Sequence, residues 1–404
     1  MTGPTTTPHI IPRAEHNISR RHISPAALSI MQRLRSQGFV AYLAGGGVRD
    51  LLLERSPKDF DIVTDAKLRD IKGLFRSCRL IGRRFRIAHV YVHGERTEVC
   101  TFRGPVDAES VVEHGHHFET RDGLIVRDNV FGTPEEDAFR RDFTVNALFY
   151  NLGDFSVIDY VGGMQDVKDR VIRSIGDPGR RYVEDPVRMI RAIRFAAALD
   201  FTMEPATYDA IVEKREHLAN ATPARMYEEI QKLFFCGKAV KVLELLLATG
   251  LFEILFPEFD SRLRESEVDK AWVSRVMRQL DIWRGAGMEV SPELLIALLF
   301  GKYHEHLAAA AVSTGMSEFE ALGTMTVEHL SRVCARITIP KSIINHVAQI
   351  MVTLPRFRKI QGRRVDRFMH RNSFHDAFLY FKLSARHSGE NAEELAWWEE
   401  HVRT

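Results

Sequence analysis

The stretch LAGGGVRDLLLERSPKDFDIVT, from Leu43 to Thr64, decides the fold of the first part of this chain. It begins at the end of an apolar β-like run, turns at three glycines, continues with the apolar spacing of a helix, and closes with a second β-like run, DFDIVT. A strand, a glycine turn, a helix and another strand in this order predict one compact unit of an α/β or α+β domain.

Two aspartates stand at the start of the second predicted strand. Side chains alternate along a strand, so Asp59 and Asp61 should share a face and lie roughly 6 to 7 Å apart. Mg²⁺ relieves the repulsion between such charges, because it binds carboxylate oxygens and keeps positions for water and phosphate. Glu98, in the predicted strand RTEVCTF, adds a third carboxylate. The three predict a site for two metal ions that promotes in-line displacement at phosphorus, although a DxD pair alone is also typical of a solvated strand or turn.

The glycine turn predicts a phosphate site. Gly45 and Gly46 let the backbone approach a ligand closely, and the first N–H groups of the helix that follows favour an anion. Arg49, in the first turn of that helix, can add a bidentate contact to phosphate. A tight strand-to-helix turn without a ligand is the alternative. The glycines match neither the P-loop nor the dinucleotide-binding pattern.

Outside this stretch the character of the chain changes once. Short β-like runs alternate with helical segments up to about Tyr160, and helical spacing of apolar residues continues almost throughout after Val161. The first residues are rich in Thr and Pro and lack the apolar core of a signal peptide. We therefore predict the following divisions: a flexible N-terminal extension over residues 1–22, a mixed-sheet head over 23–160, and helical segments over 161–220 and 221–404.

Composition excludes several classes of protein. The 404 residues carry 56 Lys and Arg against 54 Asp and Glu, so any polyanion must be held by local basic surfaces rather than by a global field. The four cysteines lie far apart without a CxxC pair, which argues against a zinc knuckle or a disulfide framework and favours a reducing cytoplasm. No apolar run approaches the roughly 18 residues of a membrane span. We expect a cytoplasmic protein with no membrane contact.

These motifs resemble the nucleotidyltransferase superfamily, and within it the class that contains bacterial poly(A) polymerases and CCA-adding enzymes. The resemblance rests on the stretch quoted above together with EVCTFRG, RRDFTVNALFYN, IDYVGGMQDVKDRVIRSIGDP and EDPVRMIRAIRFAAALDF, and it is strongest from about Gly38 to Phe201. It implies an α+β fold in which a mixed-sheet catalytic head (residues 23–160) is followed by an all-α neck that selects the nucleotide (161–220) and by an all-α body with an RNA-binding C-terminal region (221–404). It also implies ATP as substrate and Mg²⁺ at Asp59 and Asp61, with Mn²⁺ as an alternative ion.

Two further motifs point to the nucleotide. Asp142 and Asn146 are four apart on a predicted helix and share a face, and the resemblance implies that they bind the sugar and phosphates together with Arg141. Asp185 and Arg188 are three apart on another predicted helix, where a carboxylate and a guanidinium can match the hydrogen-bonding edge of a base. The resemblance implies that this second pair selects ATP, or CTP and ATP. Ordinary ion pairing is the alternative for both motifs.

Basic segments predict where RNA binds. GRRFRIAHV resembles the bacterial poly(A) polymerases more than the CCA-adding enzymes, and its Arg83 and Arg84 can contact phosphates of ATP or of the primer. The densest basic region, RFRKIQGRRVDRFMHR, contains Arg363 and Arg364, which we predict to bind the RNA backbone. A positively charged strand edge and a merely soluble helix surface are the alternatives.

The sequence therefore predicts a template-independent poly(A) polymerase that adds AMP from ATP to RNA 3′ ends and releases pyrophosphate. A CCA-adding tRNA nucleotidyltransferase is the first alternative, and a catalytically silent RNA-binding protein on the same scaffold is the second. The predicted partners are RNA 3′ ends and ATP. RNA-decay and RNA-chaperone proteins are candidate partners that the sequence does not identify.

Overall fold

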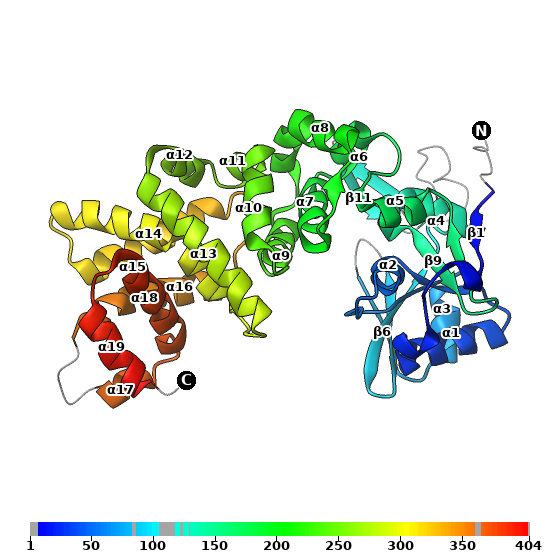
Figure 1. Ribbon diagram of the computed structural model, residues 1–404, viewed down its shortest axis with the longest axis horizontal. Coiled ribbons are helices and arrows are strands. Elements are labelled where there is room, and N and C mark those ends of the chain that lie inside the picture. The colour runs from blue at the N-terminus through cyan, green and yellow to red at the C-terminus, as the bar shows by residue number, and fades with distance from the viewer. Residues whose placement is uncertain are drawn as a thin grey trace. The chain divides into compact units, whose positions relative to one another are not determined.

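The chain forms two compact units, one of residues 1–188 and 199–214 and the other of residues 189–198 and 215–404 (Figure 1). The structure is a computed structural model that describes residues 7–82, 86–104, 118–121, 124–128, 130–359 and 365–402. For residues 118–121, 124–128 and 366 it describes the backbone alone. The four arginines predicted to bind RNA, Arg83, Arg84, Arg363 and Arg364, lie outside the described residues.

The first unit is built on a mixed eight-stranded sheet with the strand order β1-β10-β9-β2-β3-β6-β5-β4. Its strands are β1 (His9–Ile11), β2 (Ala41–Ala44), β3 (Asp61–Thr64), β4 (Cys78–Ile81), β5 (Ile87–Val92), β6 (Glu95–Thr101), β9 (Leu148–Asn151) and β10 (Val157–Asp159). The neighbours β3 and β6 run parallel, and the other neighbouring pairs are antiparallel. Two smaller sheets pair β7 (Phe118–Arg121) with β8 (Leu124–Asp128), and β11 (Val171–Ile172) with β12 (Thr202–Met203).

Short helices connect the strands of this unit. They are α1 (Pro25–Ser36), α2 (Gly46–Leu52), α3 (Leu68–Leu74), α4 (Pro134–Arg140), α5 (Gly163–Asp169), α6 (Pro178–Glu184) and α8 (Pro205–Lys214), with 3₁₀ turns η1 (Arg13–Glu15), η2 (Arg20–His22) and η3 (Thr144–Asn146). Helix α1 begins where Ser24 Oγ accepts a hydrogen bond from the amide of Ala27 at 3.1 Å, and it buries Ile30 and Leu34. The helix packs against strands β2, β3, β5 and β6 of the sheet (Figure 1).

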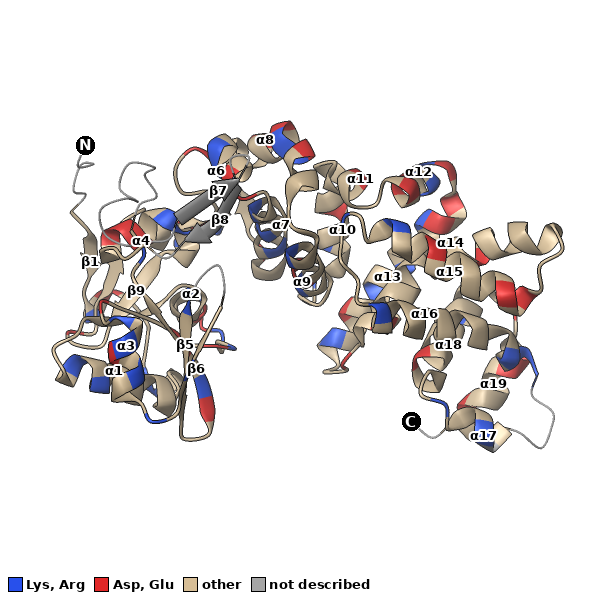
Figure 2. Cartoon of the chain, turned by 180° about the vertical axis from the view of Figure 1, so that it is seen from behind, with Lys and Arg blue, Asp and Glu red and all other residues tan. Residues whose placement is uncertain are grey.

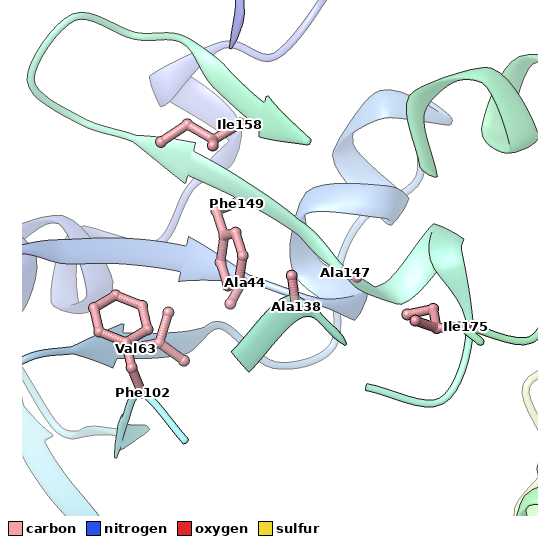
Figure 3. Close-up of a cluster of buried hydrophobic side chains, with 8 residues drawn as sticks. All are labelled: Ala44, Val63, Phe102, Ala138, Ala147, Phe149, Ile158 and Ile175. Carbon is pink, nitrogen blue, oxygen red and sulfur yellow. The ribbon is translucent and has the colours of Figure 1, made fainter. Parts of the chain in front are cut away.

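The two faces of the sheet carry different side chains. Ala44 lies opposite Asp61 on one side and Phe149 on the other, so these three side chains point to the same face. On that face Phe149 packs edge-on against Phe102, with ring centroids 6.3 Å apart, in the buried cluster drawn in Figure 3. Tyr150, next along β9, points to the opposite face.

The N-terminal segment differs from its prediction. The sequence predicts a flexible extension over residues 1–22, but His9–Ile11 form β1, an edge strand paired with β10. Ile11 and Ile18 are buried, and the ring Nε2 of His16 lies 2.8 Å from the carbonyl oxygen of Phe155. Burial of these apolar side chains and the open edge of β10 hold the segment in place. Three residues of strand pattern are too short to be recognised in a sequence.

The second unit is helical in the part that the structure describes. It contains most of α7 (Val187–Leu199) and the elements η4 (Arg215–Asn220), α9 (Pro223–Phe234), α10 (Ala239–Ala248), α11 (Leu251–Leu255), α12 (Pro257–Glu265), α13 (Glu267–Gly285), α14 (Pro292–Ser313), α15 (Glu318–Val333), α16 (Lys341–Thr353), η5 (Leu354–Arg358), α17 (Val365–Met369), α18 (Phe374–Ser388) and α19 (Ala392–His401). Trp398 is buried and donates to the carbonyl oxygen of Phe357 at 2.9 Å. The predicted α+β fold with a helical remainder is confirmed. Across the described residues no helix is long and apolar enough to span a bilayer.

Candidate active site

Two of the three predicted carboxylates lie side by side in the sheet. Asp61 is the first residue of β3, and the strand register pairs it directly with Glu98 on the parallel strand β6. Paired residues on neighbouring strands point to the same face, with backbones about 4.8 Å apart. The pairing of β3 with β6, which are separated in the sequence by two other strands, therefore brings these carboxylates together.

Asp59 lies just before β3 rather than within it. The predicted strand over residues 59–64 is two residues too long at its start. The partner strand β2 ends at Ala44, because the chain turns at Gly45 with φ +68°, so no partner remains on that side before Asp61. The strand alternation that placed Asp59 on the face of Asp61 does not apply to it. The negative charge of Asp59 nevertheless contributes to the raised pKa of Asp61.

The electrostatic environment of Asp61 favours a bound cation. The pKa of Asp61 is raised to about 6, mainly because its carboxylate is partly removed from water and also because of the charges of Glu98 and Asp59, while the charge of Arg141 acts in the opposite direction. The described residues contain no group of three or more His, Cys, Asp or Glu side chains able to hold a metal ion. Within the described part of the chain, Asp61 and Glu98 are therefore a pair of oxygen ligands rather than part of a larger ligand cluster. Such a pair fits Mg²⁺, which commonly binds one or two carboxylates and completes its coordination with water and substrate phosphates.

The glycine turn is adjacent to these carboxylates. The amide of Gly45 donates to the carbonyl oxygen of Leu148 at 3.1 Å, and α2 begins at the next residue. A Cβ at Gly45 would lie 2.9 Å from Nη1 of Arg141, and the positive φ would strain any other residue. The predicted order of strand, glycine turn, helix and strand is therefore present. Only glycine fits at its first position without moving Arg141.

Arg49 joins the glycine-turn helix to the nucleotide motif. Its guanidinium is buried and donates from Nη1 to Oδ1 of Asn146 at 2.5 Å and from Nη2 to Oδ1 of Asp50 at 2.7 Å. Asn146 in turn donates from Nδ2 to Oδ1 of Asp142 at 3.1 Å. Three predicted nucleotide-binding residues thus form one hydrogen-bonded chain. The predicted contact of Arg49 with phosphate stays a prediction. In this structure the guanidinium bonds to the side chains of Asn146 and Asp50.

Asp142 and Asn146 do not share the predicted helix. Helix α4 ends at Arg140, and Asp142 then accepts a hydrogen bond at its carbonyl oxygen from the amide of Ile175 at 3.1 Å. Phe143 forms an antiparallel bridge with Ser174, and Asn146 closes the 3₁₀ turn η3. This pairing with residues 174 and 175 gives backbone N–H and C=O groups the hydrogen-bond partners that they would otherwise have within a helix. The prediction of a helix was wrong, whereas the predicted proximity of the two side chains is present.

Arg141 is held by an acidic residue that sequence reasoning missed. Asp137 is buried and accepts from Nη2 of Arg141 at 2.8 Å and from the Nε of Arg103 at 3.3 Å. Burial alone would raise the pKa of Asp137, but the charges of Arg141 and Arg103 hold it below its usual range. Arg141 also donates to the carbonyl oxygen of Asn146 at 3.1 Å. The only sequence signal was the four-residue spacing between Asp137 and Arg141.

The predicted base-selecting pair lies at a helix break. Asp185 and Arg188 are predicted on one helix, but α6 ends at Glu184 and α7 begins at Val187. Pro186 explains the break, since its ring removes an amide donor and disfavours helical geometry at the preceding residue. Arg188 donates from Nη2 to the carbonyl oxygen of Arg140 at 3.2 Å. Arg188 therefore anchors the start of α7 against the end of α4.

His89 is a second residue that sequence reasoning missed. It lies on β5 directly opposite Glu98, and its Nε2 is 3.2 Å from Oε1 of Glu98. This nitrogen is buried and makes no hydrogen bond among the described residues. A buried polar atom this close to a predicted catalytic carboxylate needs only a small rotation to bond to it. The pairing of β5 with β6 in a hairpin brings His89 next to Glu98, and no sequence motif indicates this contact.

Similarity to known proteins identifies the family. Residues 41–173 match the poly A polymerase head domain, residues 200–263 match the probable RNA and SrmB-binding site of polymerase A, and residues 314–404 match the polymerase A arginine-rich C-terminus. The chain is 41% identical over 403 residues to poly(A) polymerase I of Salmonella typhi, across 97% of this chain and 86% of that protein. The chain belongs to the poly(A) polymerase I family. The predicted resemblance is confirmed.

The similarity to CCA-adding enzymes is more limited. The CCA-adding enzyme of Bacillus licheniformis is 33% identical over 258 residues, which cover 64% of this chain and 62% of that enzyme. Among solved structures, the Bacillus stearothermophilus CCA-adding enzyme in complex with CTP has a TM-score of 0.63 at 26% identity, with 94% of this chain and 82% of that one covered. The two groups share the fold, and the longer and closer sequence match is to poly(A) polymerase I.

Proposed function

We propose that this chain adds AMP from ATP to the 3′ ends of RNA without a template and releases pyrophosphate. The observation that carries the proposal is the pairing of Asp61 with Glu98 beside the Gly45 turn. A carboxylate pair next to a backbone turn suits a reaction in which a triphosphate and a divalent cation meet. The match to poly(A) polymerase I over nearly the whole chain supports AMP as the transferred group.

The carboxylates hold the reacting groups in this proposal. Asp59 and Asp61 bind Mg²⁺, and Glu98 lies near the attacking oxygen. When bound, the cations neutralise charge on the triphosphate and lower the pKa of the RNA 3′-hydroxyl. The 3′ oxygen forms a bond to the α-phosphorus, the bond from that phosphorus to the bridging oxygen of pyrophosphate breaks, and the hydroxyl proton is released.

The remaining predicted residues orient ATP. Gly45 and Gly46 leave room for phosphates against the start of α2, and Arg141 provides a positive charge close to Asp61. The hydrogen-bonded chain from Arg49 through Asn146 to Asp142 presents polar groups to the sugar and phosphates. Positioning by fixed side chains lowers the entropic barrier of the transfer.

Base selection and RNA binding fall to the later parts of the chain. We assign catalysis to the head (residues 23–160), adenine selection to Asp185 and Arg188 in the neck (161–220), and RNA binding to the body and C-terminal region (221–404). Basic residues gather along α7, whose sequence VRMIRAIRFAAAL carries three arginines (Figure 2). Helix α7 belongs to the neck, and two of these arginines, Arg191 and Arg194, pair with the carboxylate of Glu229 at 3.7 and 3.5 Å.

Substitution of Asp61 tests the proposal most directly. The variant Asp61→Asn should lower AMP incorporation into an oligoribonucleotide at least ~100-fold, because loss of metal-assisted charge stabilisation costs several kcal/mol of barrier. Its thermal unfolding temperature should not fall, since the substitution removes repulsion with Glu98 and Asp59. Glu95→Gln, an exposed change on the same strand as Glu98, is the matched control and should incorporate AMP normally. Retained activity in a folded Asp61→Asn would contradict the proposal.

CCA addition is the second candidate, favoured by the shared fold and by the partial match to CCA-adding enzymes. The two activities separate when the full chain is incubated with ATP or CTP and with either a generic oligoribonucleotide or a tRNA that lacks its 3′ end. Long A-only tails on the generic RNA support poly(A) addition. Completion of CCA on the tRNA followed by arrest would replace it with the second candidate.

A further inference from the structure

A basic pocket lies on the first unit at the sheet edge that β1 forms. It has a volume of about 420 Å³ and is lined by Arg13, Ser19, Arg20, Arg21, Tyr150 and Phe155. Three guanidinium groups and two hydroxyl groups line it, and no lining residue is acidic. A pocket of this size and charge suits a small anionic ligand.

The three arginines form no ion pair within the described part of the chain. Arg13 donates from Nη1 to the carbonyl oxygen of His16 at 2.7 Å, which fixes its guanidinium at one side of the pocket. Arg20 lies over the ring of Phe155, with its guanidinium carbon 4.7 Å from the ring centroid. Positive charges held around one pocket repel one another, and a bound anion would relieve that repulsion.

Tyr150 adds a hydroxyl group to the same pocket. Its side chain is almost completely buried, and its hydroxyl forms no hydrogen bond among the described residues. Asp154 is near enough to influence Tyr150, but its Oδ1 already accepts from the amide and hydroxyl of Ser156 at 3.0 and 2.7 Å. The Tyr150 hydroxyl is therefore available to donate to a ligand oxygen.

Buried contacts fix the walls of the pocket, and the pocket lies on the face of the sheet opposite to the candidate active site. Burial of Ile18 and the contact of His16 with the Phe155 carbonyl oxygen hold its walls together. Tyr150 points to the face of the sheet opposite to Phe149, and Phe149 shares its face with Asp61 through Ala44. A ligand here would be separated from the Asp61 carboxylate by the sheet.

We propose that this pocket binds a phosphate group. Guanidinium groups donate in pairs to phosphate oxygens, and the hydroxyl groups of Tyr150 and Ser19 can donate to the oxygens that remain. The phosphate comes either from solution or from an RNA backbone that passes this edge of the head. The proposal does not depend on the polymerase activity, because it rests on the pocket alone.

Calorimetric titration of the full chain with inorganic phosphate in EDTA tests the proposal, since EDTA removes divalent ions from the carboxylate site. The double variant Arg20→Gln with Arg21→Gln should weaken phosphate binding at least tenfold, and Tyr150→Phe should weaken it several-fold. Arg69→Gln, which removes one exposed guanidinium on α3, should leave it unchanged. Thermal unfolding of each variant, expected to match the unsubstituted chain, excludes loss of fold. Absent phosphate binding, or equal affinity in the unsubstituted chain and the double variant, overturns the proposal.

Equilibrium binding of an oligoribonucleotide in EDTA distinguishes the two sources of phosphate. If RNA supplies it, the double variant also loses RNA affinity and the salt dependence of binding becomes shallower. If free phosphate supplies it, RNA affinity is unchanged while phosphate binding still falls. Either result supports the phosphate site and identifies its source.

Discussion

At the residue scale, single side chains set the charge and orientation of the candidate active site. Asp61 has a raised pKa because neighbouring carboxylates and close packing disfavour its charge, and Arg141 partly offsets this effect. Glu98 has the buried imidazole of His89 beside it, 3.2 Å away. Glycine is favoured at position 45 because its φ of +68° would strain other residues and because a Cβ there would lie 2.9 Å from Nη1 of Arg141. The environment of the two carboxylates thus depends on side chains that come from separate strands and turns.

His89 gives a prediction at this scale. We expect His89→Ala to lower kcat for AMP incorporation about tenfold or more with little change in KM for ATP, because Glu98 loses the group that limits its rotation. His89→Gln keeps a donor near Glu98 and should restore part of kcat. Steady-state kinetics with ATP and an oligoribonucleotide measure both constants. A purely structural role would instead lower thermal stability in both variants and leave kcat of the folded protein unchanged.

At the element scale, the ends of helices and strands place the site residues. Strand β2 ends at the Gly45 turn, α4 ends at Arg140, and Pro186 separates α6 from α7. Asp137, in the first turn of α4, joins that helix to Arg103 beyond β6 and to Arg141. The carboxylate is buried between two guanidinium groups, so it stabilises the contact between α4 and the sheet.

The Asp137 contacts predict a large loss of stability. Removing one partner of a buried ion pair costs about 3–5 kcal/mol, and we expect this loss of unfolding free energy in Asp137→Ala. Because the pKa of Asp137 is held below its usual range in the folded state, its contribution is complete above the ordinary value of 3.8 and is lost as the pH falls below it. Urea unfolding at neutral and acidic pH measures both effects. Glu213→Ala, at an exposed ion pair on α8, should change the free energy by less than about 1 kcal/mol. A similarly small change in Asp137→Ala would contradict the expectation.

At the scale of the whole molecule, buried titratable groups in the core of one unit affect its stability toward acid. The second unit contains a buried pair in which Nε2 of His304 lies 2.9 Å from Nδ1 of His329. Burial lowers the pKa of His329 from 6.5 to about 4, although Glu258 opposes this, and burial lowers the pKa of His304 well below its ordinary value. Protonation of either ring in the folded unit is therefore disfavoured at mildly acidic pH.

This pair predicts loss of stability in the second unit on acidification. An unfolded chain binds protons at these histidines below a pH of 6.5 and the folded chain does not, so stability is full above 6.5 and falls progressively toward 4. At about pH 5 we expect a loss of roughly 2 kcal/mol from His329 alone. Hydrogen exchange at neutral pH and at about pH 5 should show faster opening of α14 and α15. The double variant His304→Leu with His329→Leu should reduce this pH dependence, and an unchanged dependence would assign it to other groups.

The sequence by itself determined the local parts of this protein. The glycine turn, the helix after it, the aspartates of DFDIVT and the helical character beyond Val161 follow from backbone freedom and hydrophobic spacing, which act over a few residues. Together with the motifs EVCTFRG, RRDFTVNALFYN, IDYVGGMQDVKDRVIRSIGDP and EDPVRMIRAIRFAAALDF, these features were sufficient to predict the α+β fold and the family. They were also sufficient to select Asp61 and Glu98 before their pairing was visible.

Tertiary structure decided which distant residues meet. The parallel pairing of β3 with β6 placed Glu98 beside Asp61, the β5–β6 hairpin placed His89 next to Glu98, and the open edge of β10 took up His9–Ile11 as a strand. Pairing with residues 174–175 overrode the helix predicted around Asp142. Strand order and register depend on which apolar faces can be buried together over the whole unit. Local sequence does not carry that information, because the partner of each strand lies far away in the chain.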